Sequence, residues 1–172
     1  MKNIAMIIAF QDFRDEEYLI PKSIFVSQGF KVKTFSSEAG EALGTYGGVV
    51  EIDDVINNLE VKTFDAVLFI GGSGAMKYED NKEAHRILKE SLKADKVIGA
   101  ICIAPVILAR AGILKGKKAT VWSSNMDKTG IKILEEEGSL YTGEDVTVDD
   151  KIVTANGPKV ARDFGEAIIR LI

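Results

Sequence analysis

Short apolar runs alternate along this chain with segments of helical periodicity, and this alternation restricts the fold more than any other feature. Apolar residues at helical spacing predict helices over residues 81–94 and 160–171, and weaker patterns indicate helices at Tyr18–Gln28 and Lys128–Glu137. The runs between them are rich in β-branched residues, as is typical of buried strands: Ile4–Ala9, Val32–Phe35, Ala66–Ile70, Val97–Ile101, Ala119–Trp122 and Ile152–Thr154. We therefore predict an α/β fold, a doubly wound and mostly parallel sheet with helices on both faces.

Two further segments carry turn residues. The pair Gly47-Gly48 indicates a turn or a small antiparallel hairpin within residues 40–54, and a second hairpin is predicted to join Val146–Val148 to Ile152–Val153. The chain contains no internal repeat, low-complexity stretch or linker, and 172 residues suffice to bury a core without metals or disulfides. We expect a single domain over residues 1–172.

Charge and cysteine content narrow the functional classes. The net charge of −4 gives no indication of a nucleic-acid or anionic-membrane partner, and the lysines at 115–118 are typical of a solvated turn. The single cysteine cannot form an intramolecular disulfide, which is typical of a reducing compartment. The apolar run Ile4–Phe10 is too short for a membrane span and lacks a small-residue cleavage site. We expect a cytoplasmic protein that needs no cofactor and no metal.

Cys102 lies where a predicted strand meets an apolar helix at Val106–Ala111. In doubly wound sheets, ligands bind outside the carboxyl ends of the strands. A thiol at this turn would face the unpaired N–H groups and the positive end of the helix, and both favour the thiolate. The alternative is an inert cysteine that packs as a small hydrophobic residue. The local sequence leaves both open.

Two other segments follow predicted strands at the same edge. The loop Gly71–Ala75 has three interpretations. It is a fragment of a dinucleotide-binding fingerprint, a loop whose N–H groups bind an oxyanion, or a plain glycine turn. In the first case Lys77 replaces the third glycine of the fingerprint. Asp15 and Glu16 suit the N-terminal end of a helix. Glu17 is a candidate proton carrier if it points inward beside a thiol, because burial and a thiolate would raise its pKa.

The only histidine, His85, falls on the predicted helix at residues 81–94 and is interpreted as a surface residue. A Cys-His catalytic pair therefore has no evident source in this chain. The segment Gly112–Lys117 is one residue too short for a phosphate-binding loop, and Lys118 stands where Ser or Thr is required.

Taken together, these segments resemble the DJ-1/PfpI superfamily along essentially the whole chain. The matching stretches are FRDEEYLIP at 13–21, FIGGSGA at 69–75, AICIAP at 100–105, LARAGILKGKKAT at 108–120 and IVTANGP at 152–158. The resemblance implies a flavodoxin-like sandwich and a homodimer or larger homo-oligomer. It implies that Cys102 is the nucleophile of an elbow and Glu17 the buried acid beside it. It also implies an oxyanion site in the Gly71-Gly72 loop, formed by the N–H groups of Gly72 and Ile103.

The chain also departs from the patterns of its relatives. Peptidase-like members carry His directly after the nucleophile, where this chain has Ile103, and Met76 stands where their supporting acid would come from a neighbouring subunit. Members closest to the human parkinsonism-linked protein carry His after the next strand, where Trp122 and Ser123 stand, and Arg where this chain has Asn156. Neither of these two additional histidines is present in this chain.

Four functions follow as hypotheses. The first is a glyoxalase- or deglycase-like enzyme of stress defence, in which Cys102 attacks small aldehydes and Glu17 moves a proton. The second is a non-enzymatic redox sensor in which an oxidant converts Cys102 to a sulfinate. A cysteine peptidase is disfavoured because both partners of the thiol are missing. A flavin or nucleotide binder of the same fold is disfavoured further.

Overall fold

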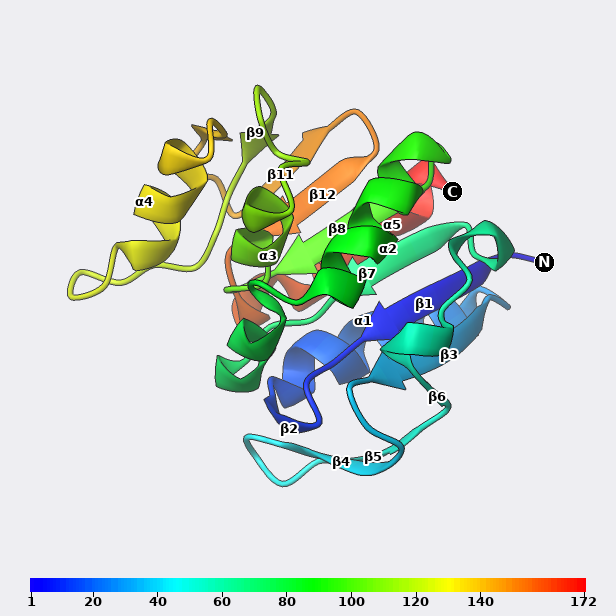
Figure 1. Ribbon diagram of the computed structural model, residues 1–172. Coiled ribbons are helices and arrows are strands. Elements are labelled where there is room, and N and C mark those ends of the chain that lie inside the picture. The colour runs from blue at the N-terminus through cyan, green and yellow to red at the C-terminus, as the bar shows by residue number, and fades with distance from the viewer.

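A seven-stranded sheet forms the centre of the computed structural model, which describes residues 1–172 (Figure 1). Its strands all run parallel except β11, which pairs antiparallel with β12 at one edge. In spatial order the strands are β11 (Val146–Asp149), β12 (Ile152–Ala155), β8 (Val97–Ile101), β7 (Ala66–Phe69), β1 (Asn3–Ile7), β3 (Lys31–Ser36) and β6 (Asp54–Val55). The predicted doubly wound, mostly parallel sheet is confirmed.

Helices cover both faces of this sheet. α1 (Asp15–Ser27) and α5 (Ala161–Leu171) pack together on one face, whereas α2 (Lys82–Lys93), α3 (Pro105–Arg110) and α4 (Thr129–Glu136) lie on the other (Figure 1). Side chains alternate along each strand, so β1 sends Ile4 and Met6 to the first face and Ala5 and Ile7 to the second. Because both faces are covered, the strands read as unbroken apolar runs.

Both expected hairpins are present. β4 (Gly40–Gly44) and β5 (Val49–Ile52) pair antiparallel, and β2 (Gln11–Phe13) joins β4 to complete a small three-stranded sheet. β11 and β12 form the second hairpin. Short 3-10 helices complete the chain at η1 (Ile56–Asn58), η2 (Val61–Thr63), η3 (Ser73–Tyr78) and η4 (Pro158–Val160).

The prediction of a strand over Ala119–Trp122 is wrong for most of its length. Only β9 (Lys118–Ala119) forms a strand, and it pairs with β10 (Leu140–Tyr141) outside the main sheet. The backbone beyond it bonds elsewhere: Thr120 N donates to Thr154 Oγ1 at 2.9 Å, and Trp122 N donates to Cys102 O at 2.8 Å. Val121 is buried, which accounts for the strand-like apolar pattern.

The strand order changes direction between β1 and β7. The chain passes from β1 to β3 on one side and then returns to β7 and β8 on the other. Such a switch point separates the two connections and opens a crevice at the carboxyl ends of the strands. The loops after β1, β7 and β8 meet there. None of the helices has the length and apolar character needed to cross a membrane.

Candidate active site

Cys102 occupies a strained turn directly after β8. Its φ of +63° lies in the left-handed region, which is rare for residues other than glycine and costs roughly 1–3 kcal/mol. Two hydrogen bonds hold the turn: Cys102 N donates to Ala155 O, and Trp122 N donates to Cys102 O, each at 2.8 Å. α3 begins with Pro105, whose missing N–H costs nothing in a first helical turn. The strand-to-helix turn expected at Cys102 is confirmed, and its role as a nucleophile stays a prediction.

Two glycines let the loop after β7 approach this elbow. A Cβ at Gly71 would lie 2.5 Å from Glu17 Oε2 and 2.6 Å from Cys102 Cβ, so only glycine leaves room for both side chains. Gly72 has φ +104°, and a Cβ there would collide with the backbone of Phe13 and Arg14. Arg14 N donates to Gly71 O at 2.9 Å and ties the two loops together.

Glu17 projects from the first turn of α1 into this junction and is completely buried. Its Oε2 accepts a hydrogen bond of 3.0 Å from Gly71 N, whereas its Oε1 is buried without a hydrogen-bond partner. The thiol of Cys102 lies within hydrogen-bonding reach of this carboxyl. A buried carboxylate with one free oxygen is costly unless that oxygen acts on a proton or a ligand.

Its neighbours in the acidic segment have different roles. Asp15 accepts hydrogen bonds from Tyr46 N at 2.9 Å and Gly48 N at 2.7 Å, and so fastens the β4–β5 hairpin to α1. Glu16 forms an ion pair with Arg14 at 2.9 Å near the surface. Of the acidic residues in this segment, only Glu17 points to the thiol.

The ionisation of Glu17 and Cys102 is coupled. Burial raises the pKa of the Glu17 carboxyl to about 7, although hydrogen bonds from Cys102 and Gly71 oppose the shift. Burial, followed by repulsion from ionised Glu17, raises the pKa of the Cys102 thiol to about 12. The pair therefore carries a single negative charge between these two values, and a thiolate forms when the remaining proton resides on Glu17.

This result corrects one expectation from the sequence. The helix that follows Cys102 was expected to favour the thiolate, but the net pKa shift of the thiol is upward because burial and Glu17 outweigh the opposing contacts. Those contacts come from the N–H groups of Gly72 and Ile103, which lower the pKa of Cys102. Neither N–H donates to a backbone carbonyl, so both remain free to bind an anion at the sulfur.

Cys102 opens into a cavity of about 600 Å³. Of the residues noted in the sequence, Gly72, Ile103, Met76 and Trp122 line it together with Cys102. Arg14, Ser73 and Glu79 also line it, and they lie in the segments after β1 and β7 that the topology brings to this edge. The sequence did not point to the remaining lining residues: Thr45, Val106, Asp127, Thr129, Gly130 and Ile133. His85 does not line the cavity, and its Nε2 lies 2.7 Å from Glu79 O.

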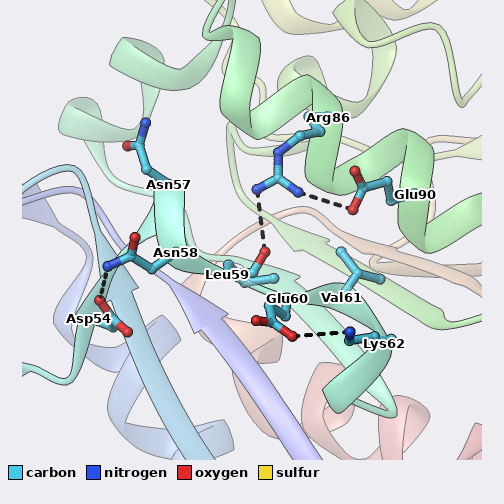
Figure 2. A pocket seen from close by; sticks show the side chains of 9 residues that line it. All are labelled: Asp54, Asn57, Asn58, Leu59, Glu60, Val61, Lys62, Arg86 and Glu90. Carbon is cyan, nitrogen blue, oxygen red and sulfur yellow. Dashed lines mark hydrogen bonds and ion pairs between the residues drawn. The ribbon is translucent and has the colours of Figure 1, made fainter.

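A second hollow of about 760 Å³ lies between the η1–η2 connection and α2 (Figure 2). Its polar groups mostly bind one another. Arg86 bonds to Glu90 and to Leu59 O, and Lys62 pairs with Glu60. It contains no nucleophile and no buried carboxylate without a partner. The candidate active site is therefore the smaller cavity at Cys102.

The chain therefore belongs to the class of doubly wound α/β proteins that carry a cysteine at a strand-to-helix turn, here directly after β8. A buried glutamate lies beside that cysteine, and two backbone N–H groups face its sulfur. The family model for the DJ-1/PfpI family matches residues 2–171, and the chain belongs to that family.

Relatives extend over nearly the whole chain. An uncharacterized protein of Methanocaldococcus jannaschii is 39% identical across 100% of this chain and 84% of its own length. A Bacillus subtilis protein named as a candidate cysteine protease is 30% identical over 99% of this chain and 98% of its own. A glutathione-independent glyoxalase of Caenorhabditis elegans is 25% identical over 99% of this chain and 89% of its own. Archaeal relatives named deglycases are 26–28% identical over 89% of both chains.

A solved structure shares the fold closely. The ThiJ/PfpI domain protein of Brachyspira murdochii superposes with a TM-score of 0.92 at 34% identity and covers 98% of this chain and 95% of its own. The names of these relatives support enzymatic activity in the family. They name different reactions, since glyoxalase, deglycase and cysteine protease all occur among them.

Proposed function

We propose that this protein is an enzyme of carbonyl defence that converts small reactive 2-oxoaldehydes to 2-hydroxy acids through Cys102 and Glu17. The observation that carries the proposal is the completely buried carboxyl of Glu17, which lies within hydrogen-bonding reach of the only thiol. Relatives named glyoxalase and deglycase support the proposal.

The first step is addition of the thiol to the aldehyde. The Cys102 sulfur forms a bond to the aldehyde carbon, the carbonyl oxygen gains the negative charge, and Glu17 holds the thiol proton. The N–H groups of Gly72 and Ile103 would stabilise that oxygen, because both are free and face the sulfur. Transfer of the proton from Glu17 to the oxygen completes a hemithioacetal.

The second step moves a hydrogen between adjacent carbons. Glu17 takes the proton from the former aldehyde carbon, which gives an enediol, and returns it to the neighbouring carbon. The hydroxyl proton of the former aldehyde oxygen passes to the neighbouring oxygen, so the hemithioacetal becomes a thioester of a 2-hydroxy acid. Water then cleaves the carbon–sulfur bond, releases the acid and restores the thiol. A carboxyl whose pKa is near 7 suits both proton transfers at neutral pH.

The test is consumption of methylglyoxal by the wild-type protein, Cys102→Ser and Glu17→Gln, with lactate measured as product. We expect turnover by the wild type and a loss of at least about a hundredfold in both variants, since each lacks a group needed for proton transfer or bond formation. Equal rates in all three proteins would overturn the proposal.

A second candidate, a peroxide sensor, is favoured by the same free amides. Two molecules of peroxide would oxidise the Cys102 thiol to a sulfinate with release of two waters, and the Gly72 and Ile103 amides would bind its oxygens. Mass spectrometry after mild peroxide should show two added oxygens on the wild type and none on Cys102→Ser. An unmodified wild type would exclude this function.

A peptidase is not proposed. Amide hydrolysis needs an acid for the departing amine, and an imidazole next to the thiol is the usual source. Ile103 follows the thiol, and His85 does not line the cavity.

A further inference from the structure

Apolar side chains from separate segments converge on the cavity at Cys102. Met76 comes from η3, Ile103 from the elbow, Trp122 from the segment after β9, Val106 from α3 and Ile133 from α4. These five side chains line one cavity and together form an apolar wall.

This wall leaves apolar surface uncovered. Val106 is fully buried, whereas Met76, Ile103, Trp122 and Ile133 are only half-buried. Met76, Ile103 and Ile133 pack against the core cluster on the α2–α3 face, which makes the wall a continuation of that core. Gly130 brings α4 close to the elbow, because a Cβ there would stand 3.5 Å from Ile103 Cδ1.

The charged groups of the cavity already have partners. Glu79 pairs with Arg110 at 3.1 Å, Arg14 pairs with Glu16 at 2.9 Å, and Asp127 Oδ1 accepts a bond from Thr129 N at 2.9 Å. Arg14 also stacks over the ring of Tyr46, with 4.7 Å between the guanidinium carbon and the ring centroid. The wall therefore favours a ligand that carries an uncharged apolar group over one that carries a carboxylate or a phosphate.

The volume also exceeds the needs of a three-carbon aldehyde. Cavities of roughly 300–1,000 Å³ bury most of the surface of a drug-sized ligand, and the cavity at Cys102, about 600 Å³, falls within this range. We propose that this cavity is a subsite for an uncharged aryl or branched-alkyl substituent, so that Cys102 acts preferentially on carbonyl compounds carrying such a group. The carbonyl part of this inference rests on the proposed function, whereas the subsite itself does not.

The subsite is tested without turnover by alkylation of Cys102. Iodoacetamide and its N-phenyl derivative share one reactive carbon, from which the thiolate displaces iodide, and they differ only in the apolar ring. The ratio of their rates is measured for Cys102 and divided by the same ratio for glutathione. We expect a preference for the phenyl reagent of about tenfold, the size expected for a ring that is desolvated against apolar side chains.

Two isoleucines of α4 provide a matched pair of variants. Ile133 lines the cavity, whereas Ile131 packs against the same core cluster but does not line it. Ile133→Ala should reduce the preference for the phenyl reagent several-fold, and Ile131→Ala should leave it unchanged. A wild-type ratio equal to that of glutathione, or equal effects of the two variants, would overturn the subsite.

Turnover separates this inference from the proposed function. Phenylglyoxal should show a higher kcat/KM than methylglyoxal in the wild type, and Ile133→Ala should narrow the difference. Absence of turnover on both aldehydes, together with a strong preference for the phenyl reagent, would reject the enzyme and retain the subsite. Efficient turnover of methylglyoxal with no preference in either assay would reject the subsite and retain the enzyme.

Discussion

Gly71 shows how one residue permits the site to form. Its lack of a side chain lets Glu17 and Cys102 lie side by side, because a Cβ would lie at 2.5–2.6 Å from both. Gly71→Ala should push these two side chains apart and abolish methylglyoxal turnover and selective alkylation of Cys102, while the protein stays folded by circular dichroism.

A matched control for this variant is Gly29→Ala. Gly29 has a positive φ of +77° with no atom within 4 Å of the added Cβ, so its substitution costs only backbone strain of about 1 kcal/mol. It should lower stability slightly and leave activity intact. Full activity in Gly71→Ala would contradict the crowding inferred at the elbow.

The buried Glu17 carboxyl also makes stability depend on pH. Its pKa is raised from near 4.5 to about 7, so between these values the folded protein holds a proton that the unfolded chain has lost. Stability must therefore fall as pH rises from about 4.5 to 7, by roughly 2–3 kcal/mol from this group alone.

Urea denaturation of the wild type and Glu17→Gln at pH 5 and pH 8 measures this effect. The variant carries no titrating group at position 17, so its loss of stability between the two pH values should be smaller by roughly 2 kcal/mol. A parallel decline in both proteins would show that Glu17 does not hold the proton.

At the scale of elements, the β4–β5 hairpin depends on Asp15. The buried carboxylate accepts bonds from Tyr46 N and Gly48 N, and the glycines at 44 and 48 leave space for it. Asp15→Ala should destabilise the protein by about 1–3 kcal/mol, because two backbone N–H groups lose their hydrogen bonds to a buried carboxylate.

Hydrogen exchange locates this loss. Exchange should accelerate at Tyr46 and Gly48 in Asp15→Ala, whereas Glu16→Ala, which removes only a surface ion pair, should change stability by less than about 1 kcal/mol. Unchanged protection of the hairpin in Asp15→Ala would contradict this role.

The sequence predicts an element correctly where a single physical cause determines its residue pattern. Burial on both faces of the sheet gives the strands their unbroken apolar runs, and turn glycines indicate the hairpin within residues 40–54. The prediction of a strand over Ala119–Trp122 is wrong because the burial of Val121 gives this segment the apolar pattern of a strand. Its backbone N–H groups do not pair with the sheet: Thr120 N donates to Thr154 Oγ1, and Trp122 N donates to Cys102 O. Periodicity reports burial and carries no information about the partner of a backbone N–H.

At the scale of the whole molecule, the centre of the site was predictable and its walls were not. Cys102, Glu17 and the glycine loop follow strands whose carboxyl ends meet at one edge, and this order follows from topology. Thr45 and Ile133 reach the cavity only through the packing of the hairpin and α4. Such placement depends on contacts between distant segments, for which the local sequence has no signal.

The assembly of the protein remains a prediction. The family resemblance implies a homodimer or larger homo-oligomer, and the chain mass is 18.7 kDa. Multi-angle light scattering of the purified protein should give about twice this mass or more, unchanged on dilution through the micromolar range. A mass of one chain would contradict the expectation.

Cys102 and Glu17 ionise as one unit, and the pH dependence of Cys102 alkylation tests this coupling most directly. In the wild type, the rate with iodoacetamide should rise through a step near pH 7, because loss of the first proton from the pair creates the reactive charge. The step should disappear in Glu17→Gln, which leaves the thiol to ionise alone. Superimposable profiles in the two proteins, each with the single step of an isolated thiol, would contradict this coupling.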